Sequence, residues 1–210
     1  MHPYLDRLGI RSEVQEFFAP FYDTDEAGNL CFSYGEGFEH YGLGFHKVPL
    51  SSGCWLAGNL CFPQVDTIVI CSSAMEAIAW LDYSWHRIAD RFSLLFFSAG
   101  ASLSGEQAAW LREHFSNKNI VMALGNDLLG RLSAVKLAAG IRGLKLQICY
   151  LAEEKVQILF RGQDYLFSPE NLSVNALEKL SGFRFRVIIS TPKNYTSFFE
   201  QRKAAAGLSF

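Results

Sequence analysis

The segment IVMALGNDLLGRLSAVK, residues 120–136, decides the fold class. Its first five residues are apolar and predict a buried strand, and apolar residues at helical spacing begin directly after the turn at 125–127. The carboxyl end of a strand in a parallel sheet is a common place for a ligand or metal ion. This turn carries one acid, Asp127, so three interpretations are open: a metal site, a metal site that has lost ligands, or a helix cap.

The same rhythm of strand and helix continues on both sides of this segment. Buried strands are predicted at 66–72, 93–100 and 144–152, and helices at 73–90 and 104–115. Strands that alternate with helices of about 10–15 residues indicate βαβ units and a parallel sheet. The predicted fold class is therefore α/β, with a four-stranded parallel sheet sandwiched by helices.

Three regions are expected along the chain. Residues 1–62 begin with a helix at Ser12 and continue as short antiparallel strands broken by glycines, which predicts an N-terminal α+β region. Residues 63–152 form the α/β core. Residues 153–210 read as a β-rich C-terminal appendage with a short helix at 173–180, a strand at 183–191 and a polar, frayed tail.

Composition restricts the function classes. The chain has 210 residues, half of them hydrophobic, and a formal net charge of −2, so no global basic field attracts nucleic acid and any such contact must come from a local patch. No apolar stretch has the length of a membrane span or the pattern of a signal peptide. Five cysteines without a CxxC pair indicate reduced thiols, so we expect a cytoplasmic protein with no membrane partner.

Two short motifs carry a resemblance to a known family. The segments SSAMEA (72–77) and GNDLLGR (125–131) resemble the two acidic motifs of the Toprim domain, which topoisomerases, bacterial primases and related nucleases share. Residues 3–18 and 30–47 resemble the entry helices and the aromatic, glycine-rich region of primase-like proteins from bacterial mobile elements. The resemblance covers residues 3–151 and implies a Toprim-like core.

The departures from the family pattern bear on catalysis. The resemblance places Glu76 and Asp127 at catalytic positions, whereas Ser72 and Gly125 replace the two other acids, and Gly130 stands where the motif has its glycine. Mg²⁺ prefers oxygen ligands, and two-metal chemistry needs several converging carboxylates. We therefore expect that ordinary catalysis is lost, with no cofactor beyond a single weakly held Mg²⁺ at Asp127.

Each motif also has a plain structural interpretation. Ser73 and Glu76 form the S-x-x-E pattern of a capping box at the start of a helix. Asn126 or Asp127 can cap the next helix, where a negative charge also suits the helix dipole. These interpretations remain open beside the metal-site hypothesis.

The best local features for nucleic-acid binding are arginines. Arg184 and Arg186 alternate along the strand predicted at 183–191, and Arg131 follows the second motif; a solvated strand face is the competing interpretation. The leading hypothesis is a DNA-transaction accessory protein that binds DNA or a replication or mobilisation protein. The alternatives are an active metal-dependent primase or nuclease, with Asp66 or Asp82 as a substitute acid, and a structural protein-interaction domain. The oligomeric state is left open.

Overall fold

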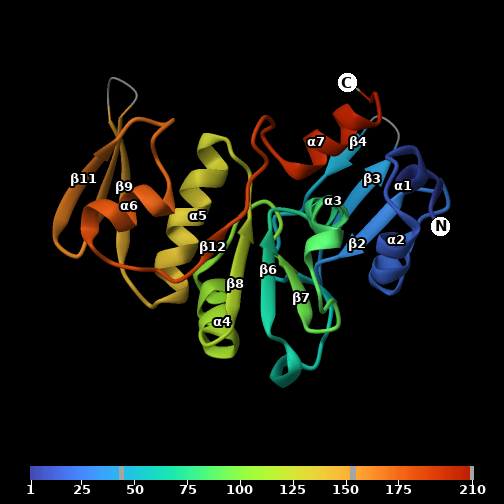
Figure 1. Cartoon of the computed structure of the whole chain (residues 1–210), viewed down its shortest axis with the longest axis horizontal. Helices are drawn as coiled ribbons and strands as arrows, with labels where there is room; N and C mark the ends of the chain where they lie inside the picture. Colours follow the sequence, from blue (N-terminus) through green and yellow to red (C-terminus); the bar gives the residue numbers. More distant parts are fainter. Residues whose placement is uncertain (43–44, 152–154, 209–210) are drawn as a thin grey trace.

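The computed structural model describes residues 1–42, 45–151 and 155–208. Its centre is a five-stranded mixed sheet in the order β12-β8-β6-β7-β5 (Figure 1). Four strands run parallel and one edge strand, β5, runs antiparallel to β7. These strands are β5 (Trp55–Gly58), β6 (Thr67–Cys71), β7 (Leu94–Ser98), β8 (Asn119–Ala123) and β12 (Ile188–Ile189). The mixed α/β character predicted from the sequence is therefore confirmed.

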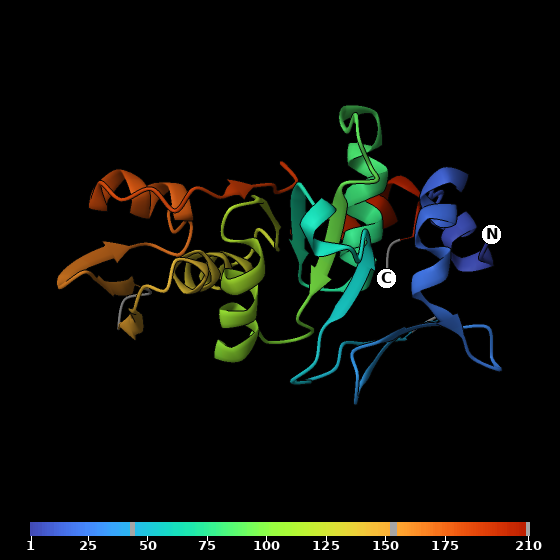
Figure 2. The same cartoon turned by 90° about the horizontal axis from the view of Figure 1, so that it is seen from below.

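Helices cover both faces of the central sheet because its inner strands are apolar on both sides. Val69 and Phe96 pack on the face that α3 (Ala74–Ser84) covers. Ile68 and Ile70 point the other way, toward α4 (Gly105–Phe115) and α5 (Leu128–Ile141). Figures 1 and 2 show α3 on one side of β6 and the pair α4 and α5 on the other.

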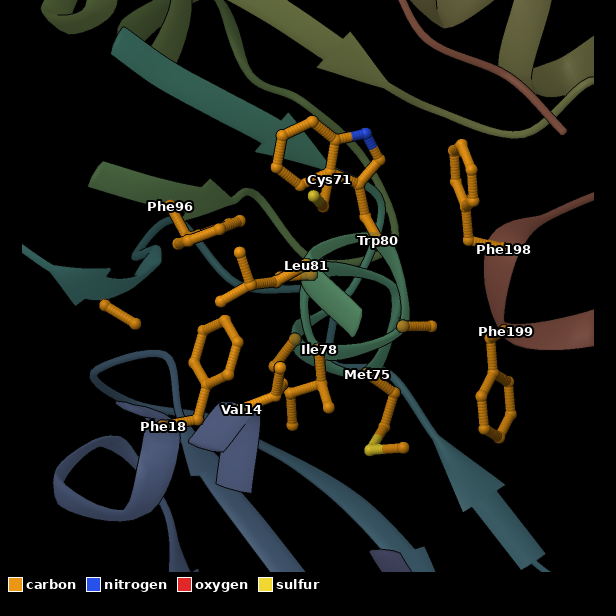
Figure 3. Close-up of a cluster of buried hydrophobic side chains, with 14 of the residues drawn as sticks. Val14, Phe18, Cys71, Met75, Ile78, Trp80, Leu81, Phe96, Phe198 and Phe199 are labelled. Carbon is orange, nitrogen blue, oxygen red and sulfur yellow. The ribbon is translucent and has the colours of Figure 1, made fainter. Parts of the chain in front are cut away.

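The N-terminal region forms helices and an antiparallel sheet, as predicted. The helices are α1 (Pro3–Arg7) and α2 (Ser12–Phe18), and the sheet has the order β1-β2-β3-β4. Its strands are β1 (Asp23–Thr24), β2 (Leu30–Ser33), β3 (Phe38–Gly42) and β4 (Phe45–Lys47). Val14 and Phe18 of α2 enter the same apolar cluster as α3 (Figure 3), so this region shares a core with the central sheet.

The segment 144–152 was predicted as the fourth parallel strand, and this prediction is wrong. Its described part, β9 (Leu146–Leu151), pairs antiparallel with β10 (Lys155–Phe160), which pairs with β11 (Gln163–Phe167) in a separate sheet. Leu146 and Ile148 lie on its half-buried face, whereas Gln147 and Cys149 are exposed. This alternation is typical of an antiparallel sheet with one solvated face, whereas a central parallel strand is apolar on both faces.

The fourth parallel strand is β12, which comes much later in the chain. It pairs with β8 through Ile188 and Ile189 alone, so the strand predicted at 183–191 is far shorter than expected. The residues before it are irregular, with Phe185 buried and Arg186 in the left-handed backbone region at φ 56°. The helix predicted at 173–180 is present as α6 (Val174–Ser181).

The C-terminal segment is not a frayed tail, contrary to the prediction. It forms α7 (Phe198–Ala205), which contacts α3, and Phe198 and Phe199 are buried there. Figure 3 shows Phe198 and Phe199 on the side of α7 that faces α3. The central sheet and its cover therefore draw on all three regions expected from the sequence.

The described residues also form three short 3-10 helices, η1 (Ala19–Phe21), η2 (Phe62–Gln64) and η3 (Trp85–Arg87). Across the described residues, no helix combines the length and the hydropathy that crossing a membrane requires.

Candidate functional site

A cavity of about 280 Å³ lies at the carboxyl ends of the parallel strands. Ser72 follows β6, Gly100 follows β7, and Gly125 and Asp127 follow β8; all four line this cavity. An adjoining, larger cavity of about 760 Å³ is lined by Ser72, Asp127 and also Glu76. The structure thus brings Ser72, Glu76, Gly125 and Asp127 to one place, because the carboxyl ends of neighbouring parallel strands meet at one edge of the sheet.

The Glu76 carboxylate is committed to the C-terminal helix. It accepts hydrogen bonds from the backbone N–H of Phe198 at 3.1 Å and of Phe199 at 3.3 Å, at the first turn of α7. Ser73 caps α3 as the S-x-x-E pattern predicts, since its hydroxyl accepts from the N–H of Glu76 at 3.1 Å. The Glu76 side chain does not complete the capping box of α3, because its carboxylate accepts from N–H groups of α7.

Glu39 is a second buried acid at this site, and the sequence analysis did not select it. It lies on β3 with no exposed surface and accepts from the N–H of Ala74 at 2.9 Å and of Met75 at 3.3 Å. The Tyr34 hydroxyl donates to it at 2.6 Å. Glu39 and Tyr41 both lie on the buried face of β3, so period-two alternation through the buried Tyr41 was the signal that could have found it.

Asp127 is the N-cap of α5, one of the two candidates that the sequence left open. Its carboxylate accepts from the N–H of Gly130 at 2.8 Å. Gly130 is needed for the turn itself, because a Cβ at that position would lie 2.0 Å from the Gly125 carbonyl oxygen. The motif glycine therefore has a packing reason at this position that is independent of any ligand.

The two buried glutamates titrate near neutrality. Burial raises the pKa of Glu76 to about 7, against the opposing effect of the hydrogen bonds from Ser197 and the α7 backbone. Burial likewise raises the pKa of Glu39 to about 7, and the charge of Glu76 adds to that rise. Loss of water around each carboxylate outweighs the hydrogen bonds that favour the charged form.

The outer wall of the larger cavity is aromatic and carries one cation, Lys203, which is paired with Glu200. His46 stacks on Tyr41 with ring centroids 3.7 Å apart, and its Nδ1 lies 3.0 Å from the Tyr41 hydroxyl. Burial lowers the pKa of His46 to about 4, helped by the charge of Lys203, so the imidazole is neutral at pH 7. Phe45 and Lys203 complete this wall.

The predicted arginines occupy three different environments. Arg131 is part of the scaffold: its guanidinium donates to Asn126 and to the carbonyls of Pro169 and Glu170. Arg184 forms an ion pair with Glu178 at 3.1 Å. Arg186 lies at the opposite end of the sheet from Asp127, beside the amino-terminal ends of β8 and β12.

Neither proposed substitute acid reaches the cavity. Asp82 is buried and paired with Arg11 at 3.0 Å and Arg202 at 3.4 Å. Asp66 precedes β6, so it lies at the other end of the strand from Ser72. Neither residue lines either cavity at the carboxyl edge.

The residues present do not fit a divalent metal centre. Among the residues that the structure describes, no group of three or more His, Cys, Asp or Glu side chains is arranged to hold a metal ion. Ser72 and Gly125 supply no carboxylate, and the carboxylates of Glu76 and Asp127 already accept from helix N–H groups. Mg²⁺ needs oxygen ligands that are free to converge on it.

Comparison with known proteins adds no family assignment. No protein-family model, curated protein or solved structure matches this chain. The site must therefore be interpreted from its own chemistry.

Proposed function

We propose that this protein is a DNA-transaction accessory protein with a Toprim-like core that has lost most of its metal-ligand acids. It acts by binding DNA or a replication or mobilisation protein of a bacterial mobile element, in the cytoplasm. The observation that carries the proposal is the use of Glu76, whose carboxylate holds the first turn of α7 at 3.1 Å from the Phe198 nitrogen. A carboxylate used in this way is a structural cap, and phosphoryl transfer needs it free.

Three acids around the strand ends support the same conclusion. Glu39 holds the start of α3, Glu76 holds the start of α7, and Asp127 caps its own helix, α5. Each carboxylate thus satisfies N–H groups that a helix start leaves without partners. Three helix starts meet at a cavity whose acids are occupied, which favours a binding role over metal-dependent catalysis.

The nucleic-acid part of the proposal is supported by the cavity wall and by the resemblance to primase-like proteins. Phe45 is 49% exposed, so its ring is available to stack on a base. Lys203 lines the same cavity, where it forms an ion pair with Glu200. Proteins that bind single-stranded nucleic acid combine aromatic side chains, on which bases stack, with cations that contact the phosphate backbone.

Salt-dependent DNA binding tests the proposal. Fluorescence anisotropy with labelled single- and double-stranded oligonucleotides is expected to give an affinity that falls as salt rises, with a negative slope of log K against log salt. Phe45→Ala is expected to weaken single-strand binding by roughly 1–3 kcal/mol. The matched control is Phe92→Ala, because Phe92 is exposed and lines neither cavity of the site. Absence of any salt-dependent binding contradicts the DNA-binding part of the proposal and favours the structural interaction domain.

An active enzyme is the second candidate, because Ser72, Glu76 and Asp127 line the same cavity. It predicts Mg²⁺- or Mn²⁺-dependent cleavage or primer synthesis that is lost in Asp127→Asn. Calorimetric titration with Mg²⁺ separates the two functions: the accessory protein shows no tight stoichiometric binding, and the enzyme shows binding that the substitution removes.

A further inference from the structure

A second pocket lies at the end of the central sheet opposite to the Glu76 site. Its volume is about 350 Å³, within the range of about 300–1,000 Å³ of small-ligand sites. It opens beside the amino-terminal ends of β8 and β12, and it lies against the carboxyl ends of α4 and α5. It is therefore separate from the cavities at the carboxyl edge.

The lining of this pocket carries positive charge without a carboxylate. Lys118, Arg142 and Arg186 contribute three cations, and among the described residues that line the pocket none is acidic. The remaining lining is Ser116, Asn117, Asn119 and two isoleucines. Hydroxyl and amide groups beside cations form the donor set that binds phosphate oxygens.

Arg142 is fixed in place by the backbone. Its Nε donates to the Phe185 carbonyl at 2.6 Å, and its Nη1 and Nη2 donate to the carbonyls of Ser116 at 2.9 Å and Arg186 at 3.0 Å. A guanidinium has five N–H donors, so two of them remain for a ligand. Because the group is already ordered, binding an anion costs little additional side-chain entropy.

Arg186 differs from the other two lining cations, because Arg142 donates to three carbonyls and Lys118 donates to the Pro63 carbonyl at 3.1 Å. Its neighbour Arg184 is paired with Glu178, whereas the Arg186 side chain has no hydrogen bond or ion pair within the described part of the chain. Its backbone has φ 56°, in the left-handed region that residues other than glycine rarely adopt. That conformation directs the Arg186 carbonyl to Arg142, so the two arginines are held beside each other.

Arg142 and Arg186 bring two like charges into one pocket. Burial lowers the pKa of Arg142, and the neighbouring charge of Arg186 lowers it further. A bound anion would relieve the repulsion that these groups exert on one another.

We propose that Lys118, Arg142 and Arg186 form a binding pocket for a phosphate group. The shared chemistry is a tetrahedral phosphate oxyanion, and its source is either the backbone of a nucleic acid or a free phosphate compound. A nucleic-acid source rests on the proposed function and extends it. It adds a contact to the nucleic-acid backbone at the end of the sheet opposite to the Glu76 cavity. The second source is independent of the proposed function.

Variants of Arg186 test the pocket. Calorimetry with inorganic pyrophosphate and anisotropy with a labelled oligonucleotide are measured for the wild-type protein, Arg186→Gln, Lys118→Gln and the control Arg184→Gln. Arg186→Gln and Lys118→Gln are expected to weaken binding of the responding probe by about tenfold or more, while Arg184→Gln changes it less than about twofold. On the oligonucleotide, Arg186→Gln is also expected to reduce the salt slope by about one.

The outcomes separate the two proposals. A loss on both probes, or on the oligonucleotide alone, supports a backbone-phosphate pocket. Pyrophosphate binding that Arg186→Gln removes, without any oligonucleotide binding, supports the pocket and contradicts the proposed DNA function. The pocket proposal is overturned when wild-type protein binds neither probe, or when Arg186→Gln and Arg184→Gln leave binding equally unchanged.

Discussion

The Glu76 carboxylate accepts a hydrogen bond from the backbone N–H of Phe198, 122 residues later in the chain, at 3.1 Å. The contact joins the first turn of α3 to the first turn of α7. It places a buried acid at the positive end of a helix dipole, where a negative charge is stabilised. An acid at a motif position associated with metal chemistry thereby holds the C-terminal helix against the core.

The first prediction concerns this contact. Glu76→Ala removes the acceptor for the N–H groups of Phe198 and Phe199, so their amide hydrogen exchange is expected to become faster. Exchange monitored by NMR or mass spectrometry measures the effect, and Glu106→Ala on the exposed first turn of α4 is the control. Unchanged exchange at both amides would show that the carboxylate does not anchor α7.

The second prediction is a pH dependence of stability. Burial raises the pKa of Glu39 from 4.5 to about 7, so the folded protein holds this proton more tightly than the unfolded chain. The contribution of Glu39 to stability is therefore complete below about pH 4.5 and is lost as pH rises through about 7. The glutamine of Glu39→Gln cannot ionise. In this variant the unfolding free energy is therefore expected to fall less steeply with rising pH than in the wild-type protein, by up to about 1.4 kcal/mol per pH unit.

Urea denaturation at several values between about pH 5 and about pH 8 measures that slope. The neighbouring buried acid, Glu76, is present in both proteins and its charge contributes to the Glu39 shift, so the difference reports Glu39 together with its coupling to Glu76. Glu106→Gln is the control for an exposed glutamate. Equal slopes for the wild-type protein and Glu39→Gln would contradict the predicted effect of burial.

The third prediction separates a cap from a metal ligand at Asp127. Asp127→Asn keeps an N-cap acceptor and is expected to change the unfolding free energy by a few tenths of a kcal/mol, whereas Asp127→Ala costs about 0.5–2 kcal/mol. Chemical denaturation without metal measures both variants. If Asn destabilises the protein as much as Ala does, the charge matters more than the cap.

The fourth prediction concerns the glycine of the second motif. Gly130→Ala places a methyl group 2.0 Å from the Gly125 carbonyl oxygen, so the turn must shift, and a loss of roughly 1–3 kcal/mol is expected. Gly105→Ala is the matched control, because no atom lies within 4 Å of its added Cβ. Thermal and urea unfolding measure both. A neutral Gly130→Ala would contradict the packing reason given for this glycine.

The fifth prediction tests whether α7 is part of the core. Phe198 is 3% exposed, and Phe198→Ala is expected to destabilise the protein by about 3–5 kcal/mol. Leu180 is 58% exposed, and Leu180→Ala is expected to stay within about 0.5 kcal/mol of the wild-type protein. Equal effects of the two substitutions would mean that α7 does not pack stably on α3.

Local patterns predicted the elements that depend on local chemistry. The apolar runs at β6, β7 and β8 are buried strands, and the helix predicted at 104–115 is present as α4, which begins with a capping box of Ser104 and Gln107. The acid of the second motif was correctly considered as a cap, because an N-cap involves only residues three positions apart. Buried strands and helix caps depend only on residues within one strand or one helical turn.

The errors concern long-range partners. The four-residue spacing between Ser72 and Glu76 gave no indication that Glu76 would contact Phe198. No local pattern indicated that β12 would pair with β8, where Val121 and Ile188 are partners more than sixty residues apart. Glu39 escaped notice because its importance arises from α3, whose backbone lies far along the chain. Pairing of distant segments depends on how the whole chain buries its apolar faces, which no short window records.

The sequence by itself determined the α/β class, the buried strands and the helix caps, since strand burial and capping follow from hydrophobic period and side-chain chemistry. Tertiary structure alone decided that Glu39 and Glu76 hold the starts of distant helices, and that Arg186 has no side-chain partner among the residues described. The partners of a charged side chain are set by the segments that pack around it. Glu76 therefore caps α7, and the Arg186 carbonyl accepts a hydrogen bond from Arg142.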